Sequence, residues 1–408
     1  MSLLRHHDFR HLWAADIVSQ LGTRLSFIAM PLLAVLDLNA TTMQVALLRT
    51  AQTAASLLLG LVAGALVDRM RCRPVLVVAD IARAVLLVSI PVTAEFGALT
   101  LAQLYAVAFL AGVGTVFFDT AHTTYLPRLV DRGMLVDGNA RLAANTSIAA
   151  VAGTGVGGFL VQALGAPFAI GLDAASYLWS ALWLRTIRRT EPRPVRGPRH
   201  LGHEIAAGVR FVWRQPILRA IAANTGTVLF FQSANDSIMV VFLVRRIHLS
   251  PGAIGLLATV GLVGALASSA VTGRIAARLG SARALLLAAA ANGVGFLCYP
   301  LTRPGVGLVW YVLAGGIAAF TIITRHVLAV SARQRLCPPY LLGRVSATME
   351  LMTWGVMPLG AVAGGILGTY LGLRPTLVLS GVAILAASLW LVASPLRRLR
   401  DIPEPAAS

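Results

Sequence analysis

Long apolar runs follow one another along nearly the whole chain, separated by short polar segments. Crossing the hydrocarbon core of a bilayer, roughly 30 Å thick, takes about 20 apolar residues. We expect a membrane helix in each of twelve runs: 12–36, 44–67, 75–94, 101–126, 144–164, 167–184, 218–243, 253–277, 283–301, 306–330, 346–371 and 376–394. Six precede and six follow the polar segment 185–217. The pattern predicts an all-α polytopic membrane protein with 12 transmembrane helices in two six-helix bundles.

A glycine ladder occurs once in each half. Gly153, Gly157, Gly158 and Gly165 recur 207 positions later, about half the length of the chain, as Gly360, Gly364, Gly365 and Gly372. Such an internal repeat indicates gene duplication and a pseudo-symmetric pair of bundles. Small residues let neighbouring helices approach closely in lipid, so the ladders are predicted to be helix-packing surfaces.

Composition and charge placement agree with this topology. Hydrophobic residues make up 57% of the chain and charged residues 12%, which excludes an ordinary soluble domain. The net charge of +18 comes from arginines, and 26 of the 34 fall on one side of the twelve-span topology. This asymmetry is the positive-inside pattern. It predicts a multi-pass protein of the inner (cytoplasmic) membrane with both termini cytoplasmic, and it explains the charge without a nucleic-acid partner.

The polar segments divide the chain into an N-terminal bundle 1–184, a cytoplasmic linker 185–217, a C-terminal bundle 218–396 and a cytoplasmic tail 397–408. The linker opens with prolines among arginines and then becomes amphipathic over 204–213, which predicts a helix at the membrane surface. The short Pro-containing tail is expected to be disordered. No disulfide pattern or metal-ligand spacing is present, and we expect the first span to be retained rather than cleaved as a signal peptide.

Polar residues inside the spans are candidates for the functional site, because each charge there costs roughly 2.5–3.5 kcal/mol on insertion scales. Asp16, Gln20 and Arg24 form one stripe at four-residue spacing, and Gln232 and Asp236 share a face of the corresponding span in the second half. A central cavity between these two spans is expected. Asp236 is predicted to pair with Arg24 or Arg49 when the outside is closed, either as a gate or as a permanent structural pair.

A second group of charges falls in the cytoplasmic half of the spans. Asp119, Arg325, His326 and Glu350 come from three different spans, and the 207 offset maps Asp119 onto His326, so an inner charge cluster is predicted. The alternative for His326 is a hydrogen-bonded structural histidine. Asp80 and Arg83, three residues apart, are expected to form an internal ion pair rather than a functional site.

The loop after the second span carries the strongest local motif, Gly64, Asp68, Arg69 and Arg73. A weaker copy with Gly273, Arg278 and Arg283 follows the eighth span, offset by 209 positions between the first glycines. Glycine allows close helix contact, Asp68 can accept hydrogen bonds from a helix N-terminus or an arginine, and the arginines can anchor the rim. We therefore interpret the loop as a conformational latch. The alternative is a basic loop that only sets topology.

This loop resembles the G-x3-D-R-x-G-x-R motif of the major facilitator superfamily. Segments distributed over essentially the whole chain are similar to the superfamily branch of macrolide and siderophore (enterobactin) exporters: Phe9–Trp13, Phe118-Asp119, Leu126–Val130, Asp173–Tyr177 and Arg210–Trp213. Two features differ from the family pattern. Phe109 precedes Gly112 and Gly114 where the family has an arginine, and Gly153 is followed by Thr154 where the exporters have proline.

The resemblance implies a secondary transporter with alternating access, coupled to a proton gradient and without a cofactor. It would export a bulky amphipathic small molecule, an antibiotic or a siderophore-like metabolite, by proton antiport. The implied partners are the substrate, protons and membrane lipids, with a monomeric chain. A lipid or lysolipid flippase is the nearest alternative. A membrane-embedded enzyme is the remote one, since no metalloprotease or nucleophile-elbow motif occurs, and no phosphate-binding loop for ATP is possible without lysine.

Overall fold

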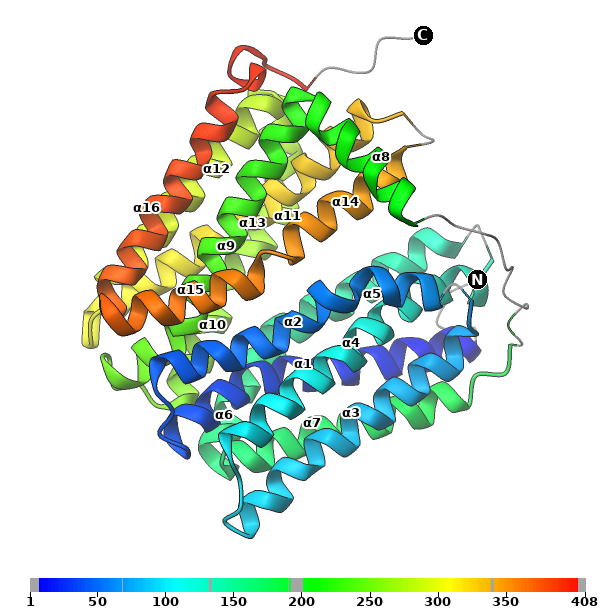
Figure 1. The fold of residues 1–408 in the computed structure, drawn as a ribbon, viewed down its shortest axis with the longest axis vertical. Helices are drawn as coiled ribbons and strands as arrows, with labels where there is room; N and C mark the ends of the chain where they lie inside the picture. Colours follow the sequence, from blue (N-terminus) through cyan, green and yellow to red (C-terminus); the bar gives the residue numbers. More distant parts are fainter. Residues whose placement is uncertain are drawn as a thin grey trace. The chain divides into compact units, whose positions relative to one another are not determined.

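The computed structural model describes residues 7–67, 69–131, 134–189, 191, 201–338 and 341–402, and these residues form helices and no strands. Clustering of contacts divides the chain into two units. Unit 1 comprises 1–197 and 249–259, and unit 2 comprises 198–248 and 260–408. Nine helices in the described part are long and apolar enough to cross a membrane. With α2, α7 and the α14–α15 pair, they correspond to the twelve expected spans (Figure 1).

Unit 1 is built from α1 (His7–Leu36), α2 (Thr42–Val67), α3 (Cys72–Glu95), α4 (Leu101–Leu129), α5 (Leu135–Ile148), α6 (Thr154–Leu164) and α7 (Ala166–Arg185). A five-residue π-helical turn over Ala149–Gly153 joins α5 to α6. Helix α1 packs on α7 and α6, α3 packs on α7 and α4, and α2 packs on α4.

Unit 2 contains α8 (Leu201–Arg214), α9 (Pro216–Arg245), α11 (Val263–Leu279), α12 (Ser281–Cys298), α13 (Val309–Leu336), α14 (Leu342–Trp354), α15 (Met357–Tyr370) and α16 (Leu373–Val392). Its packing repeats that of unit 1: α9 on α16 and α15, α12 on α16 and α13, and α11 on α13. Helix α10 (Pro251–Gly261) lies across the unit boundary in sequence. The two halves that repeat in sequence therefore also repeat the same pairs of packed helices.

Two expected spans are interrupted. The span 253–277 is divided between α10 and α11, and the span 346–371 is divided between α14 and α15 at Gly355 and Val356. Pro358 lies in the first turn of α15, where a missing N–H costs no hydrogen bond. The hydropathy pattern averages over such breaks, which is why the sequence predicted continuous helices.

The end of the chain corrects one prediction. Residues 397–402 are ordered against unit 2 rather than disordered, because Leu396 and Ile402 are buried in its core and Asp401 accepts hydrogen bonds at the start of α12. Residues 403–408 lie outside the described residues.

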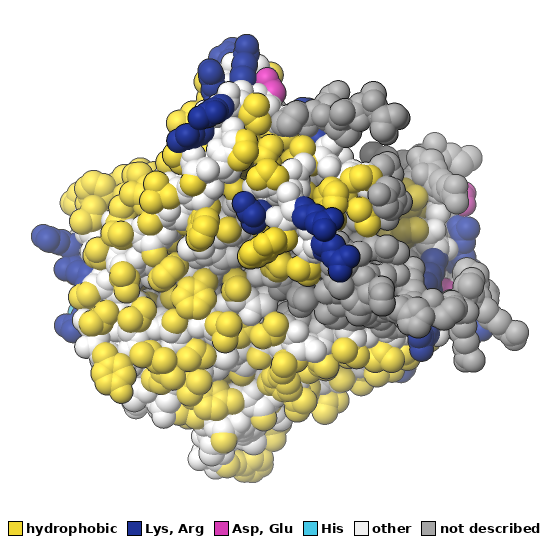
Figure 2. All heavy atoms as spheres, turned by 45° about the horizontal axis from the view of Figure 1, so that its top comes forward, with side chains coloured by type: hydrophobic (Ala, Val, Ile, Leu, Met, Phe, Trp, Pro, Cys, Tyr) yellow, Lys and Arg dark blue, Asp and Glu magenta, His cyan; other side chains and the backbone are white. Residues whose placement is uncertain are grey.

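The surface is apolar over wide areas. Large hydrophobic side chains such as Phe96, Leu182, Val306 and Tyr370 are exposed, and Figure 2 shows hydrophobic side chains over most of the visible face. Contiguous apolar surface of this extent indicates contact with lipid rather than water.

Candidate functional site

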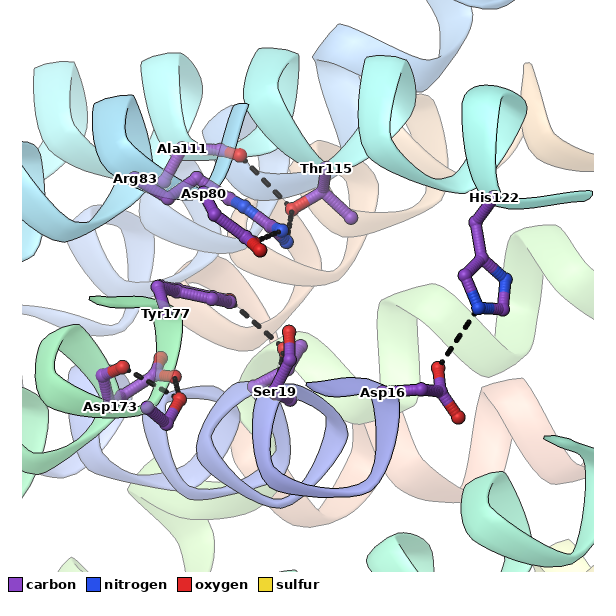
Figure 3. Close-up of polar contacts among 11 residues, drawn as sticks. Asp16, Ser19, Asp80, Arg83, Ala111, Thr115, His122, Asp173 and Tyr177 are labelled. Carbon is purple, nitrogen blue, oxygen red and sulfur yellow. Dashed lines mark hydrogen bonds and ion pairs between the residues drawn. The ribbon is translucent and has the colours of Figure 1, made fainter. Parts of the chain in front are cut away.

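Charged side chains gather in unit 1; most of them are buried or half-buried, and Asp119 is exposed. They come from α1, α3, α4 and α7, which contact one another in this unit. Figure 3 shows several of them facing one another across these helices. We call the following residues the polar cluster: Asp16, Arg24, Asp80, Arg83, Asp119, His122 and Asp173.

An ion pair on α3 forms one side of the cluster. Arg83 Nη2 donates to Asp80 Oδ1, as the three-residue spacing predicted, and both side chains are almost fully buried. The Arg83 guanidinium also lies over two aromatic rings, 4.0 Å from the centroid of Tyr177 and 4.5 Å from that of Phe118. Gly114 makes room for it, since a Cβ there would lie 2.7 Å from the Arg83 side chain. The Arg83 guanidinium from α3 thus lies beside Gly114 of α4.

A second contact joins α1, α4 and α5. Asp16 Oδ1 lies 3.4 Å from His122 Nε2, a separation and orientation that make an ion pair when the imidazole is charged but no hydrogen bond. Asp16 Oδ2 accepts a 2.8 Å hydrogen bond from Asn145 Nδ2. The Asn145 amide also donates to the Trp13 carbonyl, which fixes its orientation. Asp16 is therefore held by a neutral donor on one side and faces a titratable base on the other.

Asp119 and Arg24 extend the cluster. Asp119 interacts electrostatically with Arg83, His122, Asp16 and Arg24, yet its side chain is exposed whereas Asp16 is buried. Asp119 is thus the exposed acid of the cluster. The Nε of Arg24 is buried and makes no hydrogen bond to the described residues.

On α7, Asp173 is completely buried beside α1. It accepts a 3.1 Å hydrogen bond from the Ser176 hydroxyl. Gly22 allows this approach, because a Cβ there would lie 2.2 Å from the Asp173 carboxylate. The Tyr177 hydroxyl is 2.9 Å from Thr23 Oγ1, which donates to the Ser19 carbonyl.

The charge balance of the cluster favours proton binding. It holds four carboxyl groups, two guanidinium groups and one imidazole. A buried, unpaired carboxylate is costly, so surplus acids in such a place are neutralised by a proton or by a cationic histidine. The cluster thus holds more acidic groups than basic ones.

The remaining predicted cavity residues have separate surroundings. Gln20 is half-buried on α1, and Arg49 on α2 is buried with its guanidinium 3.7 Å from the centroid of the Phe27 ring. In unit 2, Gln232 and Asp236 are half-buried on α9. Asp236 interacts with Tyr299 and Tyr311. Its pairing with Arg24 or Arg49 would join the two units and stays a prediction.

The predicted inner charge cluster also involves both units, with Asp119 in unit 1 and the others in unit 2, and it stays a prediction. Arg325 on α13 is buried, and its Nη2 donates a 2.7 Å hydrogen bond to Asn224 Oδ1 on α9. His326 and Glu350 are exposed on α13 and α14. Arg325 thus has a neutral partner within its own unit.

The loop motif is described in part. Asp68 lies outside the described residues. Arg73 donates from Nε to the Leu184 carbonyl over 3.0 Å and from Nη2 to the Arg185 carbonyl, so it binds the C-terminal end of α7. Arg69, Arg278 and Arg283 are exposed. At Gly64 and Gly273 an added Cβ would meet none of the described residues within 4 Å, so neither glycine makes with them the close helix contact that we expected in this conformation.

Beside this loop the structure adds a residue that the sequence did not single out. Glu191, which follows α7, accepts hydrogen bonds of 2.7 Å from the backbone N–H groups of both Cys72 and Arg73 at the start of α3. Arg128 lies 3.4 Å from the same carboxylate. In unit 2, Asp401 after α16 caps the start of α12 in a similar way. The sequence held only a weak indication of His122, namely its position one helical turn after Asp119.

The glycine ladder packs helices in both units. A Cβ at Gly153 would lie 2.8 Å from the Arg24 Cβ, and one at Gly157 would lie 3.2 Å from the Leu25 Cα, both on α1. In unit 2 a Cβ at Gly360 or Gly364 would lie 2.1 Å or 2.3 Å from carbonyl oxygens of α9. Gly158 packs against Gly255 of α10 within unit 1, and Gly365 is buried. The described residues contain no group of His, Cys, Asp and Glu suited to a metal ion.

Comparison with known proteins gives a consistent result. The family model described as transmembrane secretion effector matches residues 1–406. The multidrug efflux pump Tap of Mycolicibacterium fortuitum is 28% identical over 403 residues, covering 95% of each chain. The enterobactin exporter EntS of Salmonella typhi is 26% identical over 412 residues, covering 99% of this chain and 96% of its own. The crystal structure of a bacterial homologue of the iron transporter ferroportin superposes with a TM-score of 0.76 at 17% identity. The match covers 96% of this chain and 99% of that homologue.

Proposed function

Since this chain belongs to the transmembrane secretion effector family of the major facilitator superfamily, we propose that it exports bulky amphipathic small molecules by alternating access, in exchange for protons. It is a multi-pass membrane transporter, and its relatives and fold are those of transporters rather than enzymes. The names of two relatives, a multidrug efflux pump and an enterobactin exporter, support export and a large substrate.

The polar cluster of unit 1 is the observation that carries proton coupling. Asp119 is its exposed acid, and Asp16 Oδ1 lies 3.4 Å from His122 Nε2. A proton that reaches Asp119 weakens its attraction to Arg24 and Arg83, and a proton on His122 strengthens the attraction to Asp16. Each protonation step changes which helices of unit 1 attract one another. Such a change biases a two-state transporter toward one of its conformations.

Transport driven by a pH gradient tests the proposal. The purified chain in proteoliposomes is given a pH gradient and a panel of hydrophobic cations, neutral amphiphiles, catecholate siderophores and fluorescent lysolipids. We expect the gradient to drive at least one amphiphile, and Asp119→Asn to abolish gradient-driven transport while exchange without a gradient persists. Asp137→Asn, at an exposed acid paired with Arg141 on α5, is the matched control. Full gradient-driven transport by Asp119→Asn contradicts the coupling, and transport of lysolipids alone supports the flippase alternative.

We further propose that the arginine-rich ends of both units face the cytoplasm of a bacterial inner membrane, from the arginine asymmetry. In a variant without Cys72, Cys298 and Cys337, a membrane-impermeant thiol reagent should label Phe96→Cys from outside the cell and leave Arg71→Cys unlabelled. Both positions are exposed. The reverse labelling pattern contradicts this orientation.

A further inference from the structure

Unit 2 has an apolar groove at its arginine-rich end, and none of the predicted site residues lines it. Its volume is about 710 Å³, within the range of small-molecule sites. It is lined by α8, the first three turns of α9, the junction of α14 and α15, and the end of α16. All of its lining residues belong to unit 2.

Small residues on α9 create the space. Ala220, Ala223 and Gly226 line the groove at three-residue spacing and so share one face of the helix. Among the described residues, nothing lies within 4 Å of a Cβ added at Gly226. Further along α9 the same chain is closely packed, because Gly360 of α15 lies against the Phe230 backbone. The groove is therefore open where α9 faces the junction between α14 and α15 and closed beyond it.

The rim has a different chemistry from the interior. Arg219 is exposed at the start of α9, and its Nη1 donates a 3.4 Å hydrogen bond to the Trp213 carbonyl. A guanidinium has five N–H donors, so donors remain for a ligand. Trp213 and Trp390 line the groove with exposed fractions of 64% and 53%. Exposed tryptophans of this kind are typical of the boundary between lipid chains and headgroups.

We propose that this groove binds an anionic phospholipid, with the phosphate at Arg219 and an acyl chain along α9 toward Gly226. The two residues are seven positions apart, about 10 Å along the helix axis. None of the lining residues is acidic, and the exposed Arg214 and Arg397 add positive charge near the rim. A phosphate gains charge-assisted hydrogen bonds here, whereas a lipophilic cation is repelled. The bound lipid connects α8 to α9 and α16.

Lipid-dependent thermal stability of the purified, delipidated chain tests this assignment. We expect phosphatidylglycerol to raise the unfolding midpoint saturably and phosphatidylcholine to need a concentration about tenfold higher, because its choline cation is repelled by the Arg219 guanidinium although its phosphate is the same. Arg219→Gln should weaken the phosphatidylglycerol response about tenfold and make the two lipids equivalent. Arg219→Lys should retain most of the preference, because it keeps the charge.

A larger side chain that fills the groove provides a second test of lipid binding. Gly226→Leu should abolish the response to phosphatidylglycerol without lowering the midpoint of the lipid-free protein. Gly60→Leu on α2, where an added Cβ also meets nothing within 4 Å, is the matched control and should respond as the wild type does. An unchanged lipid response in Gly226→Leu, or equal responses to both lipids in the wild type, overturns the proposal. So does protection of the wild type by a lipophilic cation that Gly226→Leu loses. If Gly226→Leu does not fold, the two Arg219 variants decide alone.

Discussion

The interiors of the two units differ in charge although their helices pack in the same pairs. In unit 1, α3 contributes the ion pair of Asp80 and Arg83 to its contacts with α4 and α7. The positions 209 residues later on α12 are Ala289 and Asn292, and they lie in the corresponding contacts of unit 2. The buried pair is thus replaced by a methyl group and an amide.

Neutral hydrogen bonds and side chains also stand in unit 2 at the contacts that correspond to the polar cluster. Asn292 Oδ1 accepts a 2.9 Å hydrogen bond from the Thr321 hydroxyl on α13. On the last helix of each unit, Asp173 corresponds to Ser380 with the offset of 207, and both are fully buried. Arg325 is the buried cation of α13, and its partner is neutral Asn224. The duplicated backbone packing therefore does not require charge, and the charges of unit 1 need another explanation, which proton coupling offers.

Breaking the ion pair of unit 1 should give the largest loss of stability. Asp80→Ala leaves the Arg83 guanidinium buried without its partner, and breaking a buried ion pair in this way costs about 3–5 kcal/mol. The double variant Asp80→Ala, Arg83→Asn reproduces the residues of α12 and should recover most of that stability. Thermal unfolding of both variants in detergent measures the difference. A double variant as unstable as the single one would show that unit 1 needs this charge for folding.

Substitutions in the glycine ladder test whether the helices of the two units are packed equally closely. Gly364→Ala places a Cβ 2.3 Å from the Ala234 carbonyl oxygen, whereas Gly157→Ala places one 3.2 Å from the Leu25 Cα. Overpacking typically costs about 1–3 kcal/mol, so Gly364→Ala should lower the unfolding midpoint clearly and Gly157→Ala much less. Equal losses would mean that α1 and α9 are equally rigid.

The caps of α3 and α12 provide a smaller comparison. The Glu191 carboxylate is almost buried and accepts two backbone N–H groups, while Asp401 is exposed and accepts one, from Ser281. Loss of a helix cap costs about 0.5–2 kcal/mol. Glu191→Ala should therefore lower the unfolding midpoint more than Asp401→Ala, and a scan of both variants at neutral pH checks the order. A larger loss in Asp401→Ala would show that the tail matters more to unit 2 than its exposure suggests.

The smallest expected effect is the pH dependence of the second cap. The hydrogen bond from the Ser281 backbone lowers the pKa of Asp401 below its ordinary value. A carboxylate with a lowered pKa in the folded state adds stability above its unfolded pKa of about 3.9, and loses it as the pH falls through the folded value. The midpoint difference between wild type and Asp401→Ala should therefore be constant at neutral pH, begin to fall below about pH 4 and vanish below the lowered pKa of the folded state. A difference that persists there would assign the effect to packing.

Much of the architecture followed from the sequence. Span positions and the duplication are local properties that add along the chain, because each segment meets the bilayer with its own residues. The ion pair of Asp80 and Arg83 was predictable for the same reason, since helix geometry alone brings residues three apart together. The breaks near Leu262 and Gly355 were missed because hydropathy does not report backbone geometry.

The partners of the site residues came only from the tertiary structure. Asp16 was recognised as a buried acid, but its contact with His122 joins residues 106 positions apart on two helices. Glu191 reaches α3 across 119 positions, and Arg83 occupies the space left by Gly114 on another helix. These contacts depend on how each helix is rotated about its axis and how closely it packs. Both are decided by the interlocking of all side chains in the unit, a collective property that no local pattern in the chain contains.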